Sequence, residues 1–305
     1  MISSDKPAAP GNGPSTSGGG TPRLGPELQY VRMVRREGYA VLAMAKEPVN
    51  SLNLDMWREL EAALDGLEAD TSCQGVIITS ALKRDVFSAG NDIMELFAPR
   101  TSGSRYAEFW VTSNRFLCKL YGSRLATIAA IRGASPAGGC MMSLCCDHRV
   151  ISSNGTLGLN EVQLGIPVPK YWAALMAKVI GHKAAEKLLL TGKMVGAAEA
   201  KTLGMVDAVV DKDGLLPAAE KVMTQLVRLP STAVAATKAN LRADFCQEWS
   251  KYYLSESIGG WEQLQRPETV AMLEASLARL ASGSAKKAAD AAAAAAAAIK
   301  PTPKL

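Results

Sequence analysis

The sequence predicts an α/β protein in which largely parallel strands are covered by helices, with a last third that is almost entirely helical. Two observations predict this fold class. As far as residue 152, short β-rich or buried apolar segments alternate with segments of helical spacing, a rhythm typical of βαβ units. From Lys170 onward, apolar residues recur almost only at helical spacing. No internal repeat is visible along the chain.

The first half of the chain contains short apolar segments that we expect to be strands. These are Tyr39–Met44, Gly75–Thr79, Ala126–Ile131 and His148–Ser152. The segments between them that have helical or generally apolar character are Leu54–Leu67, Tyr106–Tyr121 and Gly138–Cys146. The helices expected in the last third are Tyr171–Ile180, Ala184–Leu190, Ala197–Leu203, Leu215–Arg228, Ala233–Leu241 and Trp249–Leu280.

The two ends of the chain differ in composition from its middle. Residues 1–27 are rich in Gly, Pro and Ser and have almost no large apolar side chain, so we expect them to be disordered. Residues 282–305 contain a run of alanines and end in Lys-Pro-Thr-Pro-Lys-Leu, which predicts an Ala-rich flexible tail. Between these ends we expect a core at 28–210 and a C-terminal helical region at 211–281.

The overall composition restricts the class of protein. Hydrophobic residues make up 48% and charged residues 21% of the 305 residues, which is ordinary for a globular protein. No apolar run approaches the roughly 20 residues needed to cross a bilayer, and the N-terminus lacks a secretory pattern. The six cysteines form no CxxC pair, which favours free thiols over disulfides or a metal site. The net charge of +5 suits a ligand with phosphates, either coenzyme A or nucleic acid.

Three segments could carry chemistry. In residues 86–93 (Val-Phe-Ser-Ala-Gly-Asn-Asp-Ile), small side chains would let a ligand approach backbone N–H groups. In residues 133–140 (Gly-Ala-Ser-Pro-Ala-Gly-Gly-Cys), Pro136 suits the first turn of a helix, which puts the Gly138 N–H among the unpaired donors of that turn. Residues 158–167 set the carboxylate of Glu161 in an apolar segment. Singly, each is compatible with tight packing; their order along one chain indicates a site.

Together these motifs resemble the enoyl-CoA hydratase/isomerase (crotonase) superfamily over about Val31–Leu280. The resemblance is carried by Phe-Ser-Ala-Gly-Asn-Asp-Ile at 87–93, Pro-Ala-Gly-Gly-Cys at 136–140, Cys-Asp at 146–147, Leu-Asn-Glu at 159–161, Leu-Thr-Gly at 190–192, Ala-Glu-Ala at 198–200 and Gly-Met-Val-Asp at 204–207. Within the superfamily, residues 48–52 and 158–166 are most similar to the mitochondrial-type 3,2-trans-enoyl-CoA (dodecenoyl-CoA) isomerases. The resemblance implies a crotonase-like ββα spiral core with a C-terminal helical trimerisation region.

The resemblance also implies an activity. The backbone N–H groups of Asn91 and Gly138 would form an oxyanion hole that stabilises negative charge on a thioester oxygen. Hydratases of the family use two glutamates; one is retained here as Glu161, whereas the other falls at Met141. Because a proton shuttle needs one carboxylate, we expect isomerisation of 3-enoyl-CoA to 2-trans-enoyl-CoA through a dienolate, as in β-oxidation of unsaturated fatty acids.

The surroundings of the acid–base residue fit this chemistry. Leu159, Val162 and Ile166 are expected to desolvate the carboxylate and raise its pKa toward working pH, and Asn160 is expected to hydrogen-bond Glu161 or the thioester region. The further residues assigned to substrate or coenzyme A contacts are Asn50, Ser51, Ser88, Ala89, Asp92, Ile93, Tyr106 and Asn160. For Asp92, the alternative is a helix cap.

Other chemistries fit the sequence poorly. His148 and His182 are expected to be structural, which leaves no serine triad, and no phosphate loop or metal-ligand cluster is present. Coenzyme A is part of the substrate, so no separate cofactor and no metal are expected. The alternatives left open are hydration, thioester hydrolysis and, in another class, RNA binding by a crotonase-like protein. Against RNA binding, the lysines are scattered along the chain rather than gathered on one helix face.

The expected partners are an acyl-CoA thioester and further copies of the chain, as a homotrimer or a dimer of trimers, without nucleic acid or a membrane span. The chain ends in Pro303-Lys304-Leu305, a near variant of the Ser-Lys-Leu signal read by the peroxisomal import receptor. A peroxisome or a related organelle such as the glycosome is therefore the predicted location, with the mitochondrial matrix as the alternative. Against the latter, residues 1–22 contain no arginine.

Overall fold

The computed structural model describes the backbone of residues 28–298 and the side chains of residues 28–282. The disorder expected for residues 1–27 and the terminal Pro303–Leu305 signal lie outside the described residues. The α/β class is confirmed, and most of the expected elements are present close to their expected bounds.

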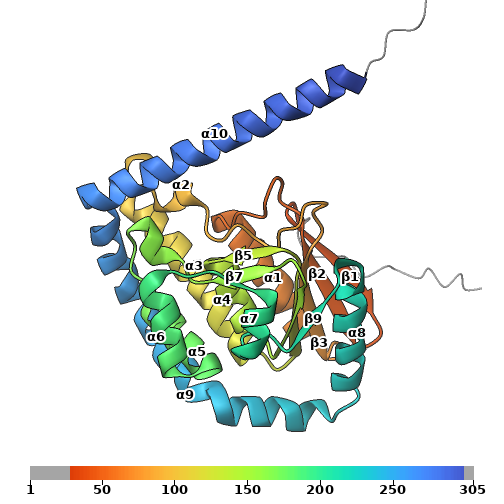
Figure 1. Cartoon of the computed structure of the whole chain (residues 1–305). Coiled ribbons are helices and arrows are strands. Elements are labelled where there is room, and N and C mark those ends of the chain that lie inside the picture. The colour runs from red at the N-terminus through yellow and green to blue at the C-terminus, as the bar shows by residue number, and fades with distance from the viewer. Residues whose placement is uncertain (1–27, 299–305) are drawn as a thin grey trace, which may run out of the picture.

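The main sheet has six strands in the order β1-β2-β3-β4-β6-β9 (Figure 1). These strands are β1 (Val31–Arg36), β2 (Tyr39–Met44), β3 (Gly75–Ser80), β4 (Ala126–Ile131), β6 (His148–Ser152) and β9 (Ala208–Val210). Within this sheet, strands β2, β3, β4, β6 and β9 pair in parallel, as expected, whereas β1 and β2 form an antiparallel hairpin. Gly38 closes this hairpin with a φ of 77°, a conformation that glycine adopts without steric cost.

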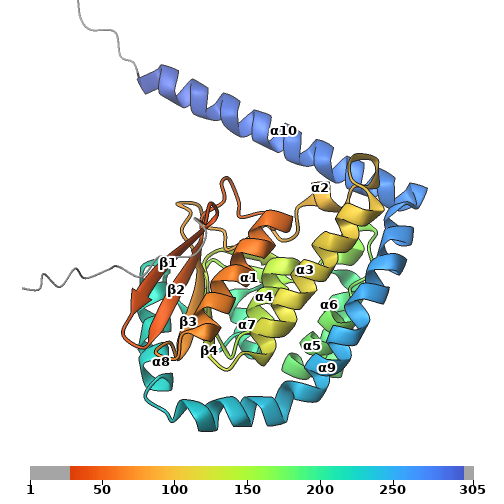
Figure 2. The same ribbon diagram turned by 180° about the vertical axis from the view of Figure 1, so that it is seen from behind.

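Helices cover both faces of the main sheet because its strands are apolar on both sides. One face, which includes Leu42, Ile78 and Ala129, packs against helices α1 (Leu54–Ala69), α3 (Gly103–Gly122) and α4 (Gly138–Leu144) (Figure 2). The opposite face, which includes Val41 and Ile128, packs against α8 (Leu215–Leu226). Helix α8 therefore completes the core, although in the sequence it lies within the C-terminal helical region.

The helices before residue 230 and the short 3-10 turns follow in chain order. They are α1 (Leu54–Ala69), α2 (Ile93–Leu96), η1 (Ala98–Arg100), α3 (Gly103–Gly122), α4 (Gly138–Leu144), η2 (Glu161–Leu164), α5 (Lys170–Ile180), α6 (His182–Thr191), α7 (Ala197–Thr202), η3 (Lys212–Gly214) and α8 (Leu215–Leu226). The apolar segment expected at 138–146 is thus a short helix.

A second, smaller sheet was not expected from the sequence. It consists of β5 (Ala134–Pro136), β7 (Thr156–Gly158) and β8 (Val195–Gly196), with β5 and β7 parallel and β7 and β8 antiparallel. Strands this short give no periodic signal. Their pairing sets Pro136 opposite Gly158, so that the two segments that follow these strands begin side by side.

The C-terminal helices differ from expectation at one point. A break was expected between residues 241 and 249, but α9 is continuous over Ser231–Leu264, and α10 follows over Pro267–Ala298. Residues 242–248 contain no Gly or Pro, and Arg242 joins Lys238 in ion pairs of 2.7 and 2.8 Å with the half-buried Asp147. The actual break precedes Pro267, which cannot continue a helix but can begin one.

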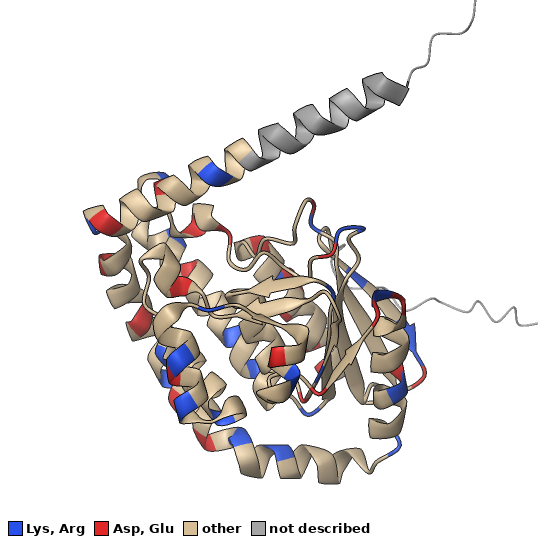
Figure 3. Ribbon diagram, in the orientation of Figure 1, with Lys and Arg blue, Asp and Glu red and all other residues tan. Residues whose placement is uncertain are grey.

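Helix α9 lies alongside α3, and α10 then crosses over the body of the protein (Figures 1 and 2). The backbone of residues 282–298, expected as a flexible tail, continues α10. Within the described part of the chain, no helix is both long enough and apolar enough to span a membrane. Lysine and arginine are interspersed with acidic residues over the surface elements, without a continuous basic face in the view shown (Figure 3).

Candidate active site

A large cavity of about 1450 Å³ opens between the body of the protein and its C-terminal helices. One part of its wall is formed by loops that follow the strands, and the rest comes from α3, α5, α9 and α10. Its lining residues come from the segments 48–51 (without Asn50), 89–96, 136–137 and 160–170, from the N-terminal half of α3, and from residues 252–264 of α9 and 276–280 of α10. The three segments singled out from the sequence therefore meet at one cavity.

The first of these segments presents the amide of Asn91. Residue 91 pairs in parallel with Leu52, and the ladder bonds on both sides of it run from Leu52 N to Gly90 O and from Asp92 N to Leu52 O. In such a ladder, the residue between the two bonds directs its own N–H to the opposite side. The Asn91 N–H therefore points away from Leu52, and it has no acceptor among the described residues.

The second segment presents the amide of Gly138 in the first turn of α4, where backbone N–H groups have no partner within the helix. The preceding Ala137 has a φ of 48° and donates its own N–H to Gly158 O at 2.8 Å. This positive φ is unusual for a residue with a Cβ. The pairing of β5 with β7 thus fixes the start of the helix and leaves the Gly138 N–H without an acceptor in the described chain.

Glycines bring these two segments into contact. A Cβ added at Gly90 would lie 2.9 Å from Pro136 O and 3.6 Å from Gly138 N. A Cβ added at Gly138 would lie 2.8 Å from Oδ1 of Asn91. The segments that carry the two amides are therefore in direct contact, and Asn91 and Ala137 of these segments line the cavity.

The third segment places Glu161 in the same cavity as Asn91. Strand β7 ends at Gly158, opposite Pro136, and Glu161 begins the turn η2 three residues later. The Glu161 side chain lines the cavity but is only 7% exposed, and neither carboxylate oxygen has a hydrogen-bond partner among the described residues. Burial raises the pKa of Glu161 from its ordinary 4.5 to about 7, as expected for a desolvated carboxylate.

The turn that carries Glu161 is held on two sides. Gly165 ends it with a φ of 72°, and the Gly165 carbonyl accepts hydrogen bonds from Thr269 Oγ1 at 3.3 Å and Gln263 Nε2 at 3.4 Å. On the other side, Gln163 donates to the carbonyl of Gly192 at 2.9 Å. The junction between α9 and α10 therefore helps to hold the turn that carries Glu161.

Most of the other expected contact residues also line the cavity. Those that do are Ser51, Ala89, Asp92, Ile93, Tyr106 and Asn160. Asp92 also caps α2 by accepting from the Met94 N–H at 3.1 Å, so the cap interpretation is confirmed. The expected bond between Asn160 and Glu161 is absent in the structure, since Asn160 Oδ1 and both Glu161 oxygens have no partner among the described residues.

Asn50 and Ser88 do not line the cavity, which corrects their assignment as substrate contacts. Asn50 is fully buried, and its Nδ2 is within hydrogen-bond distance of the Met44 and Phe87 carbonyls and of Ser80 Oγ. Ser88 Oγ donates to Asn50 O at 2.8 Å and accepts from Gly90 N at 3.0 Å. Both residues instead hold the loop that presents the Asn91 amide.

The structure also shows cavity residues that sequence reasoning missed. Trp110 lies one turn after Tyr106 on α3, and their rings stack with centroids 5.9 Å apart. Glu256 of α9 accepts from Trp110 Nε1 at 3.3 Å and from Lys170 N at 2.9 Å, and burial raises its pKa. The spacing of Tyr106 and Trp110 could have indicated a shared face, whereas nothing in the sequence marks Glu256.

Met141 is fully buried inside α4 and does not line the cavity. His148 lies in β6 beside Asp207, and His182 begins α6, so neither histidine reaches the cavity either. The described residues contain no group of three or more side chains suited to hold a metal ion. Among carboxylates of the cavity, only Glu161 combines burial with two oxygens that have no partner in the described chain.

The sequence profile of the enoyl-CoA hydratase/isomerase family matches residues 35–258. The chain belongs to this family. Its crotonase fold is shared with the crystal structure of human mitochondrial delta3-delta2-enoyl-CoA isomerase, which superposes with a TM-score of 0.80 at 34% identity, covering 84% of this chain and 99% of that one.

Sequence relatives within the family include isomerases and hydratases. The mitochondrial enoyl-CoA delta isomerase 1 of mouse is 40% identical over 207 residues, which are 67% of this chain and 71% of the mouse protein. The human protein of the same name is 39% identical over 227 residues, or 74% of each chain. A short-chain-enoyl-CoA hydratase of Clostridium acetobutylicum is 30% identical over 214 residues, 70% of this chain and 80% of the hydratase. Membership in the family implies an acyl-CoA substrate.

Proposed function

We propose that this crotonase-family enzyme is a Δ3-Δ2-enoyl-CoA isomerase, which moves the double bond of a 3-enoyl-CoA to give the 2-trans-enoyl-CoA. The observation that carries the proposal is Glu161, a buried cavity carboxylate with a pKa of about 7 whose two oxygens have no hydrogen-bond partner among the described residues. The similarity to proteins named enoyl-CoA delta isomerase supports it.

The reaction needs one base that later acts as an acid. Ionised Glu161 removes a proton from the α-carbon of the 3-enoyl thioester, and the electron pair left behind delocalises onto the thioester oxygen as a dienolate. The N–H groups of Asn91 and Gly138 donate hydrogen bonds to that oxygen; losing one such donor typically raises the barrier by about 3–4 kcal/mol. Protonated Glu161 then returns the proton to the γ-carbon, which leaves the double bond conjugated with the thioester.

The pKa of Glu161 suits both steps. A general base works best when its pKa lies near the working pH, because enough of it is ionised while it still attracts the proton. A pKa of about 7 meets this condition. Hydration would need a second catalytic glutamate, and the position where family hydratases carry it is Met141, buried inside α4.

The test is a rate comparison between 3-enoyl-CoA and 2-trans-enoyl-CoA substrates of graded chain length. We expect turnover of the first class, followed by the absorbance of the conjugated thioester, and little hydration of the second. Glu161→Gln should bind the thioester but lose isomerisation by about 10³-fold or more. Isomerisation by this variant within about tenfold of the wild-type rate would show that another residue moves the proton.

We also propose that the chain assembles as a trimer or a dimer of trimers. Leu254 and Ile258 support this, since they lie one turn apart on α9 and are 60% and 64% exposed, more than a helix facing only solvent would favour. Light scattering should give three or six times the chain mass of 32.2 kDa. A monomer at micromolar concentration would contradict the proposal.

For location, we propose a peroxisome-type organelle addressed by Pro303-Lys304-Leu305. Removal of these three residues from a fluorescent fusion should leave the protein in the cytosol. Import of the shortened fusion into mitochondria would instead assign the targeting signal to the N-terminus.

A further inference from the structure

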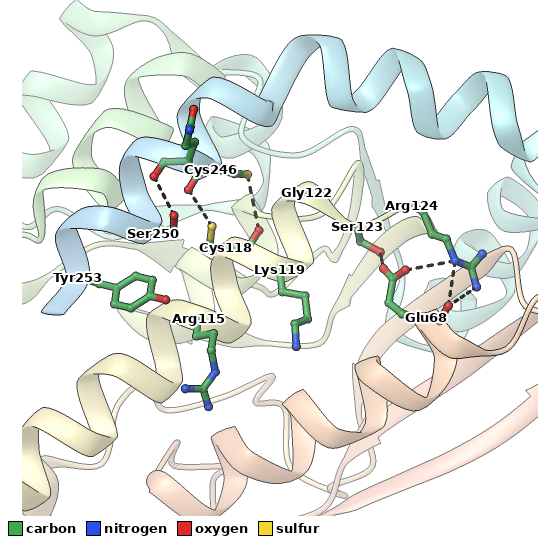
Figure 4. A pocket seen from close by; sticks show the side chains of 11 residues that line it. Glu68, Arg115, Cys118, Lys119, Gly122, Ser123, Arg124, Cys246, Ser250 and Tyr253 are labelled. Atoms are coloured by element: carbon green, nitrogen blue, oxygen red, sulfur yellow. Dashed lines mark hydrogen bonds and ion pairs between the residues drawn. The ribbon is translucent and has the colours of Figure 1, made fainter.

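An open depression of about 610 Å³ lies on the outside of the protein between α3 and α9, apart from the residues that line the active-site cavity. Cys118 of α3 and Cys246 of α9 face each other in it (Figure 4). Cys118 Sγ lies 3.4 Å from Cys246 O, and Cys246 Sγ lies 3.7 Å from Cys118 O. This reciprocal contact brings two thiols from residues 128 positions apart into one small space.

The space around the pair is open to small molecules. Both cysteines are partly exposed, and Gly122, one turn after Cys118, also lines the depression. A Cβ at Gly122 would come within 3.3 Å of Cys246 Sγ, so the absence of a side chain there keeps one side of this sulfur uncovered. Arg115 and Lys119 also line the depression (Figure 4).

The two thiols differ in acidity. The interaction with the Cys118 side chain lowers the pKa of Cys246, and the nearby Arg242 guanidinium acts in the same direction. The same pairing raises the pKa of Cys118. Because the thiolate is the form that reacts with oxidants, Cys246 is the more reactive sulfur and Cys118 stays a protonated neighbour.

The other four cysteines provide an internal comparison. Cys73, Cys140, Cys145 and Cys146 are at most 2% exposed. Burial raises the pKa of each of them, which keeps them as thiols, and buried thiols of this kind are inert. Cys118 and Cys246 are therefore the two cysteines that are partly exposed, lie close together and differ in acidity.

We propose that Cys246 and Cys118 form a peroxide-oxidisable pair that cross-links α3 to α9. In the first step, the Cys246 thiolate attacks hydrogen peroxide, the O–O bond breaks, and a sulfenic acid and hydroxide form; the hydroxide takes up a proton to give water. In the second step, the Cys118 sulfur attacks the sulfenic sulfur, its proton leaves with the hydroxyl as a second water, and the S–S bond forms. Two thiols are oxidised and one peroxide is reduced to two waters.

The cross-link would join two walls of the active-site cavity. Helix α3 contributes Tyr106 and Trp110 to the cavity, and α9 contributes Tyr252 and Glu256. The bond would close a loop of more than 100 residues, which removes conformational freedom from the unfolded chain. The oxidised protein should therefore unfold at a temperature higher by at least about 2 °C.

The test is peptide mapping of the full chain after treatment with one to a few equivalents of hydrogen peroxide, with alkylation of the remaining thiols. We expect alkylation of four cysteines, a peptide pair joined through Cys118 and Cys246, a mass loss of about 2 Da per chain, and reversal by dithiothreitol. Six alkylated cysteines after treatment, or loss of thiols among the buried four, would overturn the proposal.

Variants separate the two steps. In Cys118→Ser, Cys246 should accumulate as a sulfenic acid that dimedone traps, or as its higher oxidation products. In Cys246→Ser, Cys118 should remain alkylatable after the same treatment, and Cys73→Ser should form the cross-link as the wild type does. If the remaining Cys118 of Cys246→Ser were oxidised to the same extent as the remaining Cys246 of Cys118→Ser, the assignment of Cys246 as the attacking thiolate would be contradicted. Because the wild-type map alone decides whether the cross-link forms, the result does not depend on how the variants fold.

Discussion

Replacing Glu161 by glutamine should stabilise the protein more at high pH than at low pH. Burial raises the pKa of Glu161 from 4.5 to about 7 in the folded protein, so ionising it costs roughly 3 kcal/mol more in the folded state than in the unfolded chain. Because the folded pKa is the higher one, the folded protein keeps its proton longer. The penalty is absent below pH 4.5, grows between pH 4.5 and 7, and is complete above pH 7.

Glutamine has no such penalty, so the gain in unfolding free energy from Glu161→Gln should be about 2.5 kcal/mol larger at pH 8.5 than at pH 5. Denaturant unfolding of both proteins at the two pH values measures this difference, and any pH-independent effect of the amide cancels. The control is Glu248→Gln, at a side chain 60% exposed on α9, which should change by less than about 0.5 kcal/mol between the two conditions. An equal gain from Glu161→Gln at both pH values would refute a desolvated carboxylate at this position.

Three further results are expected. The value of kcat/KM should rise with pH through an apparent pKa near 7, because the ionised form of Glu161 is the base; a flat profile between pH 5 and 8 would contradict this. Thr269→Val removes a hydrogen bond to the turn that carries Glu161. It should lower kcat more than it changes KM and should shift that apparent pKa, whereas Thr269→Ser should keep the wild-type kcat and pKa. Equal kinetics of the two variants would exclude a positioning role for Thr269. Gly138→Ala would set a Cβ 2.8 Å from Asn91 Oδ1 and should lower kcat by about 10²–10³-fold, whereas Gly66→Ala, with open space around its Cβ, should leave kcat unchanged.

The parts of the fold that the sequence predicts well are those with a strong local signal. Strands such as Gly75–Ser80 and helices such as Leu54–Ala69 repeat apolar residues over several turns or alternations, and the motifs at 87–93, 136–140 and 159–161 mark their own loops. The same motifs contain Glu161, Asn91 and Gly138. In the structure Glu161 and Asn91 line one cavity, and Gly138 lies behind that lining in contact with Asn91.

The features of the fold and of the site that the sequence does not predict depend on contacts between residues far apart in the chain. Helix α9 continues through a segment in which Arg242 pairs with Asp147, and these two residues lie 95 positions apart and show no local pattern. Asn50 and Ser88 belong to a motif next to the site, but whether a polar side chain in such a motif faces the ligand or the loop interior is decided by tertiary hydrogen bonds. Glu256 reaches the cavity only because α9 folds back along α3.

The central claim is that Glu161 alone carries the proton from the α-carbon to the γ-carbon. The most direct measurement uses a 3-enoyl-CoA with deuterium at the α-carbon in ordinary water, and mass spectrometry to locate the label in the 2-trans-enoyl product. Because the carboxylate is buried and holds the proton away from solvent, a measurable fraction of the deuterium should appear at the γ-carbon. Complete loss of the label to water at the shortest reaction times would contradict a one-base shuttle and would indicate separate groups for removing and returning the proton.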